Sequence, residues 1–304
     1  MWLLGCEKDI PLQKGNCFEI PPSDYALGYE RTGPTLTYGE PAFNPNNMNE
    51  IVCVKGTSSL IRYNLKTLER KQVFDQGIFS KPDWGSDNRI YFTARDFQIW
   101  RVQSNGENLM PLTDSAQNFA PDLSPDGKHL VISSDREYAS KRLYLFNIES
   151  KDYQQISFEE IVGMSQPVWS PDGQWFACFA NVRAGEDWEA WVIAIDVKQD
   201  TFRKVTKNTR ESVYDIAWLN SQKIIWSSKS GIYKTDWQGN QIRIKKSCDS
   251  KRYTSISSSH SDNRILAERH DKKLTGENTL YSASKIVLMN ANGSNERVIL
   301  PEKE

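Results

Sequence analysis

Few side chains in this sequence have the types and the spacing that catalysis needs. The 304 residues include three histidines, His129, His260 and His270, and none stands in a His-Glu-x-x-His or His-x-His string that would hold a metal ion. Only the first half of the Gly-x-Ser-x-Gly string of a serine nucleophile occurs, at Gly163 to Ser165. We therefore expect no catalytic residue, no metal site and no cofactor.

Six cationic residues have a spacing that favours anion binding instead. Each follows, by four to seven residues, the first apolar residue of a predicted strand, and they are Lys55, Arg95, Arg136, Arg183, Lys229 and Arg269. A ring of such side chains around a channel mouth would hold a carboxylate, a phosphate or an acidic peptide tail, because Arg offers a planar, bidentate set of donors. The alternative is that these cations pair with nearby carboxylates, as surface charges commonly do.

Aromatic residues occur in the same predicted loops and crossings, at Phe79, Phe119, Tyr138, Trp188, Tyr214 and Tyr253. Such side chains stack on sugar rings or anchor a protein partner. Three tryptophans recur at one position of a repeat, Trp84, Trp169 and Trp218, so we expect these to be core residues, whereas Trp188 lies outside that pattern. We predict a binding surface of Arg95, Arg136, Tyr138, Arg183, Trp188, Arg269 and His270.

An internal repeat defines the elements that position these residues. Its clearest copies are Ala-Pro-Asp-Leu-Ser-Pro-Asp-Gly-Lys at 120–128 and Gln-Pro-Val-Trp-Ser-Pro-Asp-Gly-Gln at 166–174. Equivalent positions fall near residues 41, 82, 121, 167, 214 and 255, about 43 residues apart. The sequence therefore contains six copies of one structural unit.

Each copy has the features of four short antiparallel strands, which we name A to D. Pro, Asp and Gly suit the turn between strands A and B, because Pro presets φ, Asp bonds the nearby backbone and Gly accepts a left-handed conformation. The second halves are aromatic and β-branched, as at 98–102 and 143–148, and precede further turn residues. Four strands per copy predict an all-β fold, a six-bladed β-propeller of four-stranded antiparallel blades over residues 41–304, preceded by a tether or strap at 1–40.

The two faces of such a disc differ in sequence. The A–B and C–D turns share one face, and the B–C loops share the other with the crossings between blades. Length varies in the B–C loops, which we predict at 134–141, 180–189 and 269–284. Binding residues concentrate on variable loops held by a rigid scaffold, so we place the binding surface on the B–C face.

The Pro-x-Trp-Ser-Pro-Asp-Gly strings and the Leu112-Thr113 strand ending resemble the TolB-type β-propeller repeat over about residues 41–300. A true WD repeat has Gly-His and Trp-Asp dipeptides, and this chain has neither. The resemblance implies a non-catalytic propeller of the bacterial cell envelope. Similar propellers occur beside prolyl oligopeptidase domains and in oligogalacturonate lyases. They imply an alternative, a channel-centred lyase or hydrolase that acts on a carbohydrate or a peptide with His270 and loop carboxylates.

The N-terminus and the five cysteines bear on the compartment. Leu-Leu-Gly-Cys at residues 3–6 resembles a bacterial lipobox, in which Cys6 would be acylated, but the apolar stretch before it is too short for a signal peptide. Either the given start is truncated or the match is chance. Cys53 and Cys178 fall in opposite blades and are expected to be buried thiols. The sequence does not decide whether Cys17 and Cys248 form a disulfide near the closure of the ring.

Composition excludes several classes of partner. There are 38 basic and 39 acidic residues, so the net charge is −1, which argues against nucleic-acid binding. No run of about eighteen apolar residues is present to span a membrane. We expect a periplasmic or cell-surface scaffold, membrane-bound only through a lipid on Cys6, that binds a protein or a glycan. A second alternative is a propeller that serves only as a spacer in a larger complex.

Overall fold

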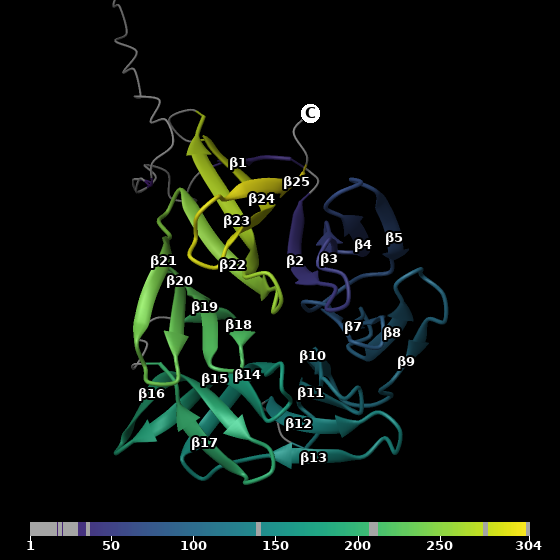
Figure 1. The fold of residues 1–304 in the computed structure, drawn as a ribbon, viewed down its shortest axis with the longest axis vertical. Coiled ribbons are helices and arrows are strands. Elements are labelled where there is room, and N and C mark those ends of the chain that lie inside the picture. Colours follow the sequence, from purple (N-terminus) through teal and green to yellow (C-terminus); the bar gives the residue numbers. More distant parts are fainter. Residues whose placement is uncertain are drawn as a thin grey trace, which may run out of the picture.

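The computed structural model describes residues 17, 20, 30–34, 37–137, 141–206, 212–275 and 279–301. Within these residues the chain forms twenty-five β-strands and no helix. The strands form six sheets around a central axis (Figure 1). The predicted six-bladed β-propeller is confirmed. In the described part of the chain, no helix of the length and hydropathy that a bilayer requires occurs.

The first three blades each consist of four consecutive antiparallel strands. Blade 1 contains β2 (Tyr38–Phe43), β3 (Glu50–Lys55), β4 (Ser59–Asn64) and β5 (Arg70–Phe74). Blade 2 contains β6 (Asp83–Trp84), β7 (Arg89–Thr93), β8 (Ile99–Gln103) and β9 (Met110–Pro111). Blade 3 contains β10 (Asn118–Leu123), β11 (His129–Ser134), β12 (Arg142–Asn147) and β13 (Tyr153–Ile156).

The other three blades follow the same order. Blade 4 contains β14 (Ile161–Trp169), β15 (Trp175–Ala184), β16 (Asp187–Asp196) and β17 (Thr201–Lys204). Blade 5 contains β18 (Val213–Asn220), β19 (Lys223–Ser228), β20 (Gly231–Asp236) and β21 (Gln241–Lys246). Blade 6 contains β22 (Lys251–Ser258), β23 (Arg264–Leu274), β24 (Thr279–Asn290) and β25 (Arg297–Leu300).

The Pro-Asp-Gly strings form the A–B turns, as predicted. In blade 3, Asp126 Oδ1 accepts hydrogen bonds from Ser124 Oγ at 2.6 Å and from the Lys128 amide at 3.1 Å. Gly127 has φ 74°, in the left-handed region where a side chain is disfavoured. Asp172 makes the same two contacts in blade 4, so the repeat conserves the turn because the backbone needs these residue types there.

Two predicted B–C loops are wrong. The segment 180–189 belongs to β15 and β16, which pair up to Ala184 and Asp187 around a two-residue turn. The segment 269–284 likewise belongs mostly to β23 and β24, which pair up to Leu274 and Leu280. In both segments the B and C strands stay paired beyond the body of the blade, where a loop was expected. Both hairpins therefore extend past the strands beside them.

The recurrent tryptophans pack between blades, as predicted. Trp84 lies in a buried cluster of blades 1 and 2, Trp169 in one of blades 3 and 4, and Trp218 in one of blades 4 and 5. Burial of a large aromatic side chain supplies much of the apolar contact between two sheets. Cys53 and Cys178 are free and buried, also as predicted.

The start of the chain is attached to the last blade. β1 (Glu30–Thr32) pairs in parallel with Thr279–Tyr281 of β24, and β25 pairs with Ile286–Leu288 on the same edge of that strand. Cys17 forms a disulfide with Cys248 at a Cα separation of 5.7 Å, between blades 5 and 6. The possible disulfide is thus present, and the expected strap adds a strand to blade 6.

Candidate functional site: the central cavity and the B–C face

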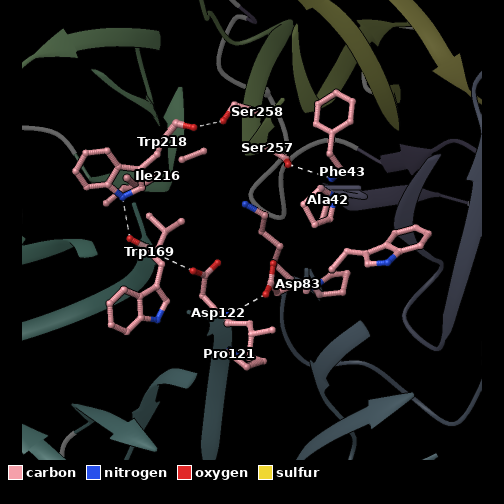
Figure 2. A pocket seen from close by; sticks show the side chains of 18 of the residues that line it. Ala42, Phe43, Asp83, Pro121, Asp122, Trp169, Ile216, Trp218, Ser257 and Ser258 are labelled. Carbon is pink, nitrogen blue, oxygen red and sulfur yellow. Dashed lines mark hydrogen bonds between the residues drawn. The ribbon is translucent and has the colours of Figure 1, made fainter. Parts of the chain in front are cut away.

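A cavity of about 610 Å³ occupies the centre of the ring (Figure 2). Its wall is formed by the A strands β2, β6, β10, β14, β18 and β22. Its rim includes the A–B turn residues Asn46, Ser86, Pro125, Pro171 and His260. None of the described residues that line it comes from a B–C loop. The cavity therefore opens among the Pro-Asp-Gly turns, on the face opposite the predicted binding surface.

One residue from each blade contributes to a ring inside the cavity, and these are Glu40, Lys81, Ala120, Gln166, Asp215 and Ser255. In five blades a β-bulge or irregularity interrupts the pairing of the A and B strands at or beside this position. Glu40, Ala120 and Gln166 have positive φ angles of 51°, 49° and 55°. A bulge re-aims side chains, and here it places the ring residues on the cavity wall.

Side chains nearer the rim join neighbouring A strands at several of the blade junctions. The hydrogen bonds run from Leu123 N to Asp83 Oδ2 (2.9 Å), from Trp169 N to Asp122 Oδ2 (2.6 Å) and from Phe43 N to Ser257 Oγ (3.2 Å) (Figure 2). Asp215 of the ring also accepts the Ile256 amide, at 2.7 Å. These bonds connect neighbouring blades at four of the six junctions. The carboxylates of Asp83, Asp122 and Asp215 therefore have a structural role.

The cavity is rich in acidic groups. Glu40, Asp83, Asp122 and Asp215 line it, and among its described lining residues Lys81 is the one Lys or Arg. Lys81 Nζ lies 2.8 Å from Asp215 Oδ2 and also donates to the Ile256 carbonyl. The ammonium group therefore neutralises Asp215, and the other three carboxyl groups have no ion pair within the described part of the chain.

Burial and mutual repulsion raise the pKa values of three of these carboxyl groups. Burial, reinforced by the charges of Asp215 and Glu268, raises the pKa of Glu40 to about 7. Burial also raises the pKa of Asp83 to about 6 and, with the charge of Asp83, that of Asp122 well above its ordinary value. The cavity thus gains negative charge as the pH rises through neutrality.

Two predicted site residues, Arg269 and His270, are committed to contacts within blade 6 and at its border with blade 5. Arg269 is ion-paired with Asp271 at 2.7 Å and with Glu296, which is also 2.7 Å from Lys245. The guanidinium group is therefore neutralised, as in the alternative that the sequence left open. His270 Nε2 lies 3.2 Å from Glu268 Oε1 and 3.1 Å from Thr254 Oγ1, and it does not line the cavity.

The expected ring of cations does not surround the cavity, since none of its six members is a lining residue. Arg136 lies over the ring of Tyr153 on strand D, 3.6 Å from the ring centroid, so it follows the outer part of blade 3. Arg95 is exposed in the B–C turn of blade 2. Tyr138 and the lipidation candidate Cys6 lie outside the described residues.

Arg183 and Trp188, two further predicted site residues, come together on the hairpin of blade 4. They are directly opposite each other in the pairing of β15 and β16. Trp188 is 62% exposed, and Arg183 is exposed as well. This hairpin carries an aromatic and a guanidinium group on one projecting tip.

A second aromatic feature of the B–C face joins blades 2 and 3. Phe79, Phe97 and Phe119 form a row with centroid separations of 4.6 Å and 5.6 Å, and Lys141 Nζ lies 3.5 Å from the centre of the Phe119 ring. Phe79 is half-exposed. Two of the aromatic residues that the sequence singled out, Phe79 and Phe119, therefore lie in one cluster with Phe97. Tyr253, by contrast, is buried and donates its hydroxyl proton to Glu296.

Sequence reasoning missed the acidic residues of the cavity. Asp83 and Asp122 occupy the middle of the Pro-x-Trp position of their repeats, where blade 4 has Val168. A charged residue in a strand predicted to be buried was the available signal. Among the described residues, no group of three or more His, Cys, Asp or Glu side chains is arranged to hold a metal ion.

Known sequences resemble only parts of this chain. No family model matches the sequence. An uncharacterized protein from Agrobacterium fabrum is 31% identical over 125 residues, which is 36% of this chain and 42% of that protein. The uncharacterized peptidase YuxL from Bacillus subtilis is 30% identical over 89 residues, which is 29% of this chain and 13% of the peptidase. The match thus spans less than half the length of either relative.

Solved structures resemble most of the chain. TolB from Acinetobacter baumannii superposes with a TM-score of 0.53 at 14% identity, covering 88% of this chain and 56% of TolB. The fold is that of the TolB-type propeller. An oligogalacturonate lyase in complex with manganese gives a TM-score of 0.58 at 14% identity, covering 78% of this chain and 74% of the lyase. At these identities both likenesses show the β-propeller fold alone, because one propeller fold hosts many functions.

Proposed function

We propose that this TolB-like propeller is a non-catalytic binding scaffold of the bacterial cell envelope, and that it engages a protein or glycan partner through its B–C face. The observation that carries the proposal is the projecting hairpin of blade 4, with Trp188 62% exposed opposite Arg183. Trp and Arg are the residue types most enriched among the side chains that dominate binding energy in protein interfaces. This pair favours a protein partner.

The Phe79, Phe97 and Phe119 row supports the same face. It offers a half-exposed aromatic surface with Lys141 beside it, on a different blade junction from Trp188. Two separate aromatic and cationic features on one face suit a partner that spans several blades. The TolB structure supports an envelope role by likeness of fold.

The disulfide between Cys17 and Cys248 supports the proposed location in the cell envelope. Disulfides persist in the periplasm and outside the cell, whereas the cytosol keeps thiols reduced. A lipid on Cys6 remains part of the proposal, and the mass of the mature N-terminal peptide from membrane and soluble fractions tests it.

Replacement of Trp188 by Ala tests the binding face. We expect the retention of an envelope partner on the immobilised protein to fall about thirtyfold, because loss of a dominant interface tryptophan costs about 2 kcal/mol or more. Ile242→Ala is the matched control, since Ile242 is 59% exposed on β21, away from the B–C face. Partner amounts measured by mass spectrometry, and glycan arrays probed with the same variants, give the readout.

Three results would contradict the proposal. Equal retention by the wild type and Trp188→Ala would remove the hairpin from the interface. Crosslinks to the partner that map mainly to Asp126, Lys128, Asp172 and Gln174 would move the interface to the Pro-Asp-Gly face. Tight binding of a divalent metal that is lost in His270→Ala would favour the enzyme alternative.

A further inference from the structure

We propose that the protein partner of the B–C face is a second copy of this chain, bound face to face through the projecting hairpins of blades 4 and 6. The inference rests on the proposed function, since it names the partner of that same face. β15 and β16 pair over ten residues and β23 and β24 over eleven, whereas the B and C strands of the other blades pair over five or six. Each residue adds about 3.3 Å along a strand, so the two hairpins extend roughly 15 Å beyond the ends of the shorter B and C strands.

The hairpin of blade 4 is acidic on the side that faces blade 3. Ile193 of β16 packs into the apolar cluster shared with blade 3, and alternate residues of a strand point to one side, so Asp187 and Glu189 share that side. Glu159 and Glu160 are exposed in the crossing from blade 3, which is bonded to the hairpin through the Glu160 carbonyl. These four carboxylates, which we call the acidic side, make no ion pair with any residue that the structure describes.

Two cations offset only part of this charge. Lys204 Nζ lies 4.3 Å from the centre of the Trp191 ring, and Arg142 donates a hydrogen bond to the backbone of β14 at 3.2 Å. Arg183 faces the other side of the hairpin, toward blade 5, together with Trp188. Four carboxylates against two cations leave the acidic side negative.

The hairpin of blade 6 is basic on the side that faces blade 5. Ala267 of β23 packs into the cluster shared with blade 5, so alternate residues beyond it continue on that side, together with their cross-strand neighbours. The charged residues on this basic side are Lys251, Arg269, Asp271, Lys273 and Lys285.

The basic side keeps its positive charge in spite of its ion pairs. Asp271 is shared by Arg269 and Lys285, and Glu296 is shared by Arg269 and Lys245 of blade 5. Lys251 and Lys273 have no ion pair within the described part of the chain. An acidic surface would therefore find unpaired ammonium groups here.

The two charged sides are placed as a two-fold axis in the plane of the disc requires. The acidic side faces from blade 4 toward blade 3, and the basic side faces from blade 6 toward blade 5, so both face the lower-numbered blade (Figure 1). Turning a second copy over reverses its blade order. With the axis close to blade 5, the basic side of each copy then faces the acidic side of the other. The same contact forms twice, as in other symmetric dimers.

A second copy is favoured over an unrelated protein because this face carries both signs of charge. A partner of one sign would be attracted by one hairpin and repelled by the other. A second copy presents both signs at the spacing of this ring. Trp188, 62% exposed on the side of its hairpin that faces blade 5, lies toward the axis and within the same interface.

Charge reversal tests the pairing of the hairpins. Glu160→Lys with Asp187→Lys makes the acidic side basic, and Lys251→Glu with Lys273→Glu makes the basic side acidic. In sedimentation velocity at low salt and tens of micromolar protein, the wild type should be a dimer. Each double variant should raise the dissociation constant about a hundredfold, because like charges then face each other. An equimolar mixture of the two double variants should recover a dimer that contains one copy of each.

Glu69→Lys with Glu149→Lys is the matched control. Both residues are exposed in C–D turns, on the opposite face, and the net charge changes as much as in the first double variant. This control should dimerise like the wild type, and melting temperatures confirm that each variant is folded. High salt should dissociate the wild-type dimer, because exposed charges are screened.

Three results would overturn the inference: a wild type that stays monomeric at these concentrations, a mixture of the two double variants that forms no heterodimer, or an equal loss of dimer in the control. The proposed function fails separately. A monomeric wild type that retains another envelope protein through Trp188 would leave that function standing. A dimer that survives Trp188→Ala, with no envelope protein retained through Trp188, would uphold the pairing of the hairpins and remove Trp188 from it.

Discussion

At the scale of the residue, the ionisation of Glu40 makes the charge of the central cavity depend on pH. Its pKa is about 7 in the folded protein against an ordinary value of 4.5, and burial is the largest cause. The folded state therefore binds this proton more tightly than the unfolded state does. The contribution of the protonated Glu40 to the free energy of unfolding is complete below about pH 4.5 and is lost as the pH rises through about 7.

We expect Glu40→Gln to raise the free energy of unfolding by about 2–3 kcal/mol at pH 8 and by much less at pH 5. The amide cannot ionise, so it avoids the cost of a buried charge at high pH. Urea unfolding at both pH values measures the difference. Glu149→Gln, on an exposed turn, is the control for net charge. An equal gain at pH 5 and pH 8 would be inconsistent with ionisation of Glu40 as the cause.

At the scale of the element, Gly39 on β2 is required by a close approach of blade 6. A Cβ atom at this position would lie 2.6–2.8 Å from the carboxyl group of Glu268. That carboxyl group cannot move freely, because it accepts hydrogen bonds from Ser284 Oγ at 2.6 Å and from the Glu40 amide at 3.3 Å. The glycine therefore allows the first and last blades to meet.

Gly39→Ala should destabilise the protein by about 1–3 kcal/mol, as overpacking of a filled site does. Gly163→Ala is the matched variant on the A strand of blade 4, where the nearest atom to the new Cβ is 3.8 Å away. It should be neutral or slightly stabilising, since alanine reduces the entropy of the unfolded chain. The denaturant midpoints of the two variants and of the wild type measure these changes in stability. The same loss of stability in both would show that strand propensity, and not the contact with Glu268, is responsible.

At the scale of the whole molecule, the ring closes where blade 1 meets blade 6, and within the described residues none of the four strands of blade 1 pairs with blade 6. Blades 1 and 6 meet through side chains and backbone, with bonds from Phe43 N to Ser257 Oγ and from Arg264 to the Met48 carbonyl. The start of the chain adds β1 to β24 and the disulfide between Cys17 and Cys248. These covalent and strand contacts hold the strap to blade 6 and to its border with blade 5.

Cys17→Ser should lower the free energy of unfolding by about 2–5 kcal/mol, because the bond constrains an unfolded chain over 231 residues of separation. The wild type in a reductant should match the variant, and the variant itself should be insensitive to reductant. Thermal and urea unfolding with and without reductant measure both effects. A wild type whose stability is unchanged by complete reduction would show that the disulfide does not support the closed ring.

Much of the fold follows from short-range rules in the sequence. A turn of Pro-Asp-Gly needs only the local preferences of three residues, and a strand needs alternating or β-branched side chains, so six copies predict six blades. Trp84, Trp169 and Trp218 were predictable as core residues because a residue that recurs at one position of a stacked repeat faces the next copy. Segments 180–189 and 269–284 were harder, because polar residues in a projecting hairpin resemble those of a loop.

The sequence alone determined the repeat, its turns and the identity of the packed tryptophans, since each depends on residues close together in the chain. Only the tertiary structure placed Glu40, Lys81, Gln166 and Asp215 around one cavity, because they are far apart in sequence and meet only when the ring closes. It also turned that cavity toward the Pro-Asp-Gly face, neutralised Arg269 with Glu296, and joined Cys17 to Cys248. Each of these outcomes is a long-range encounter, which the geometry of the closed ring decides and local residue preferences do not.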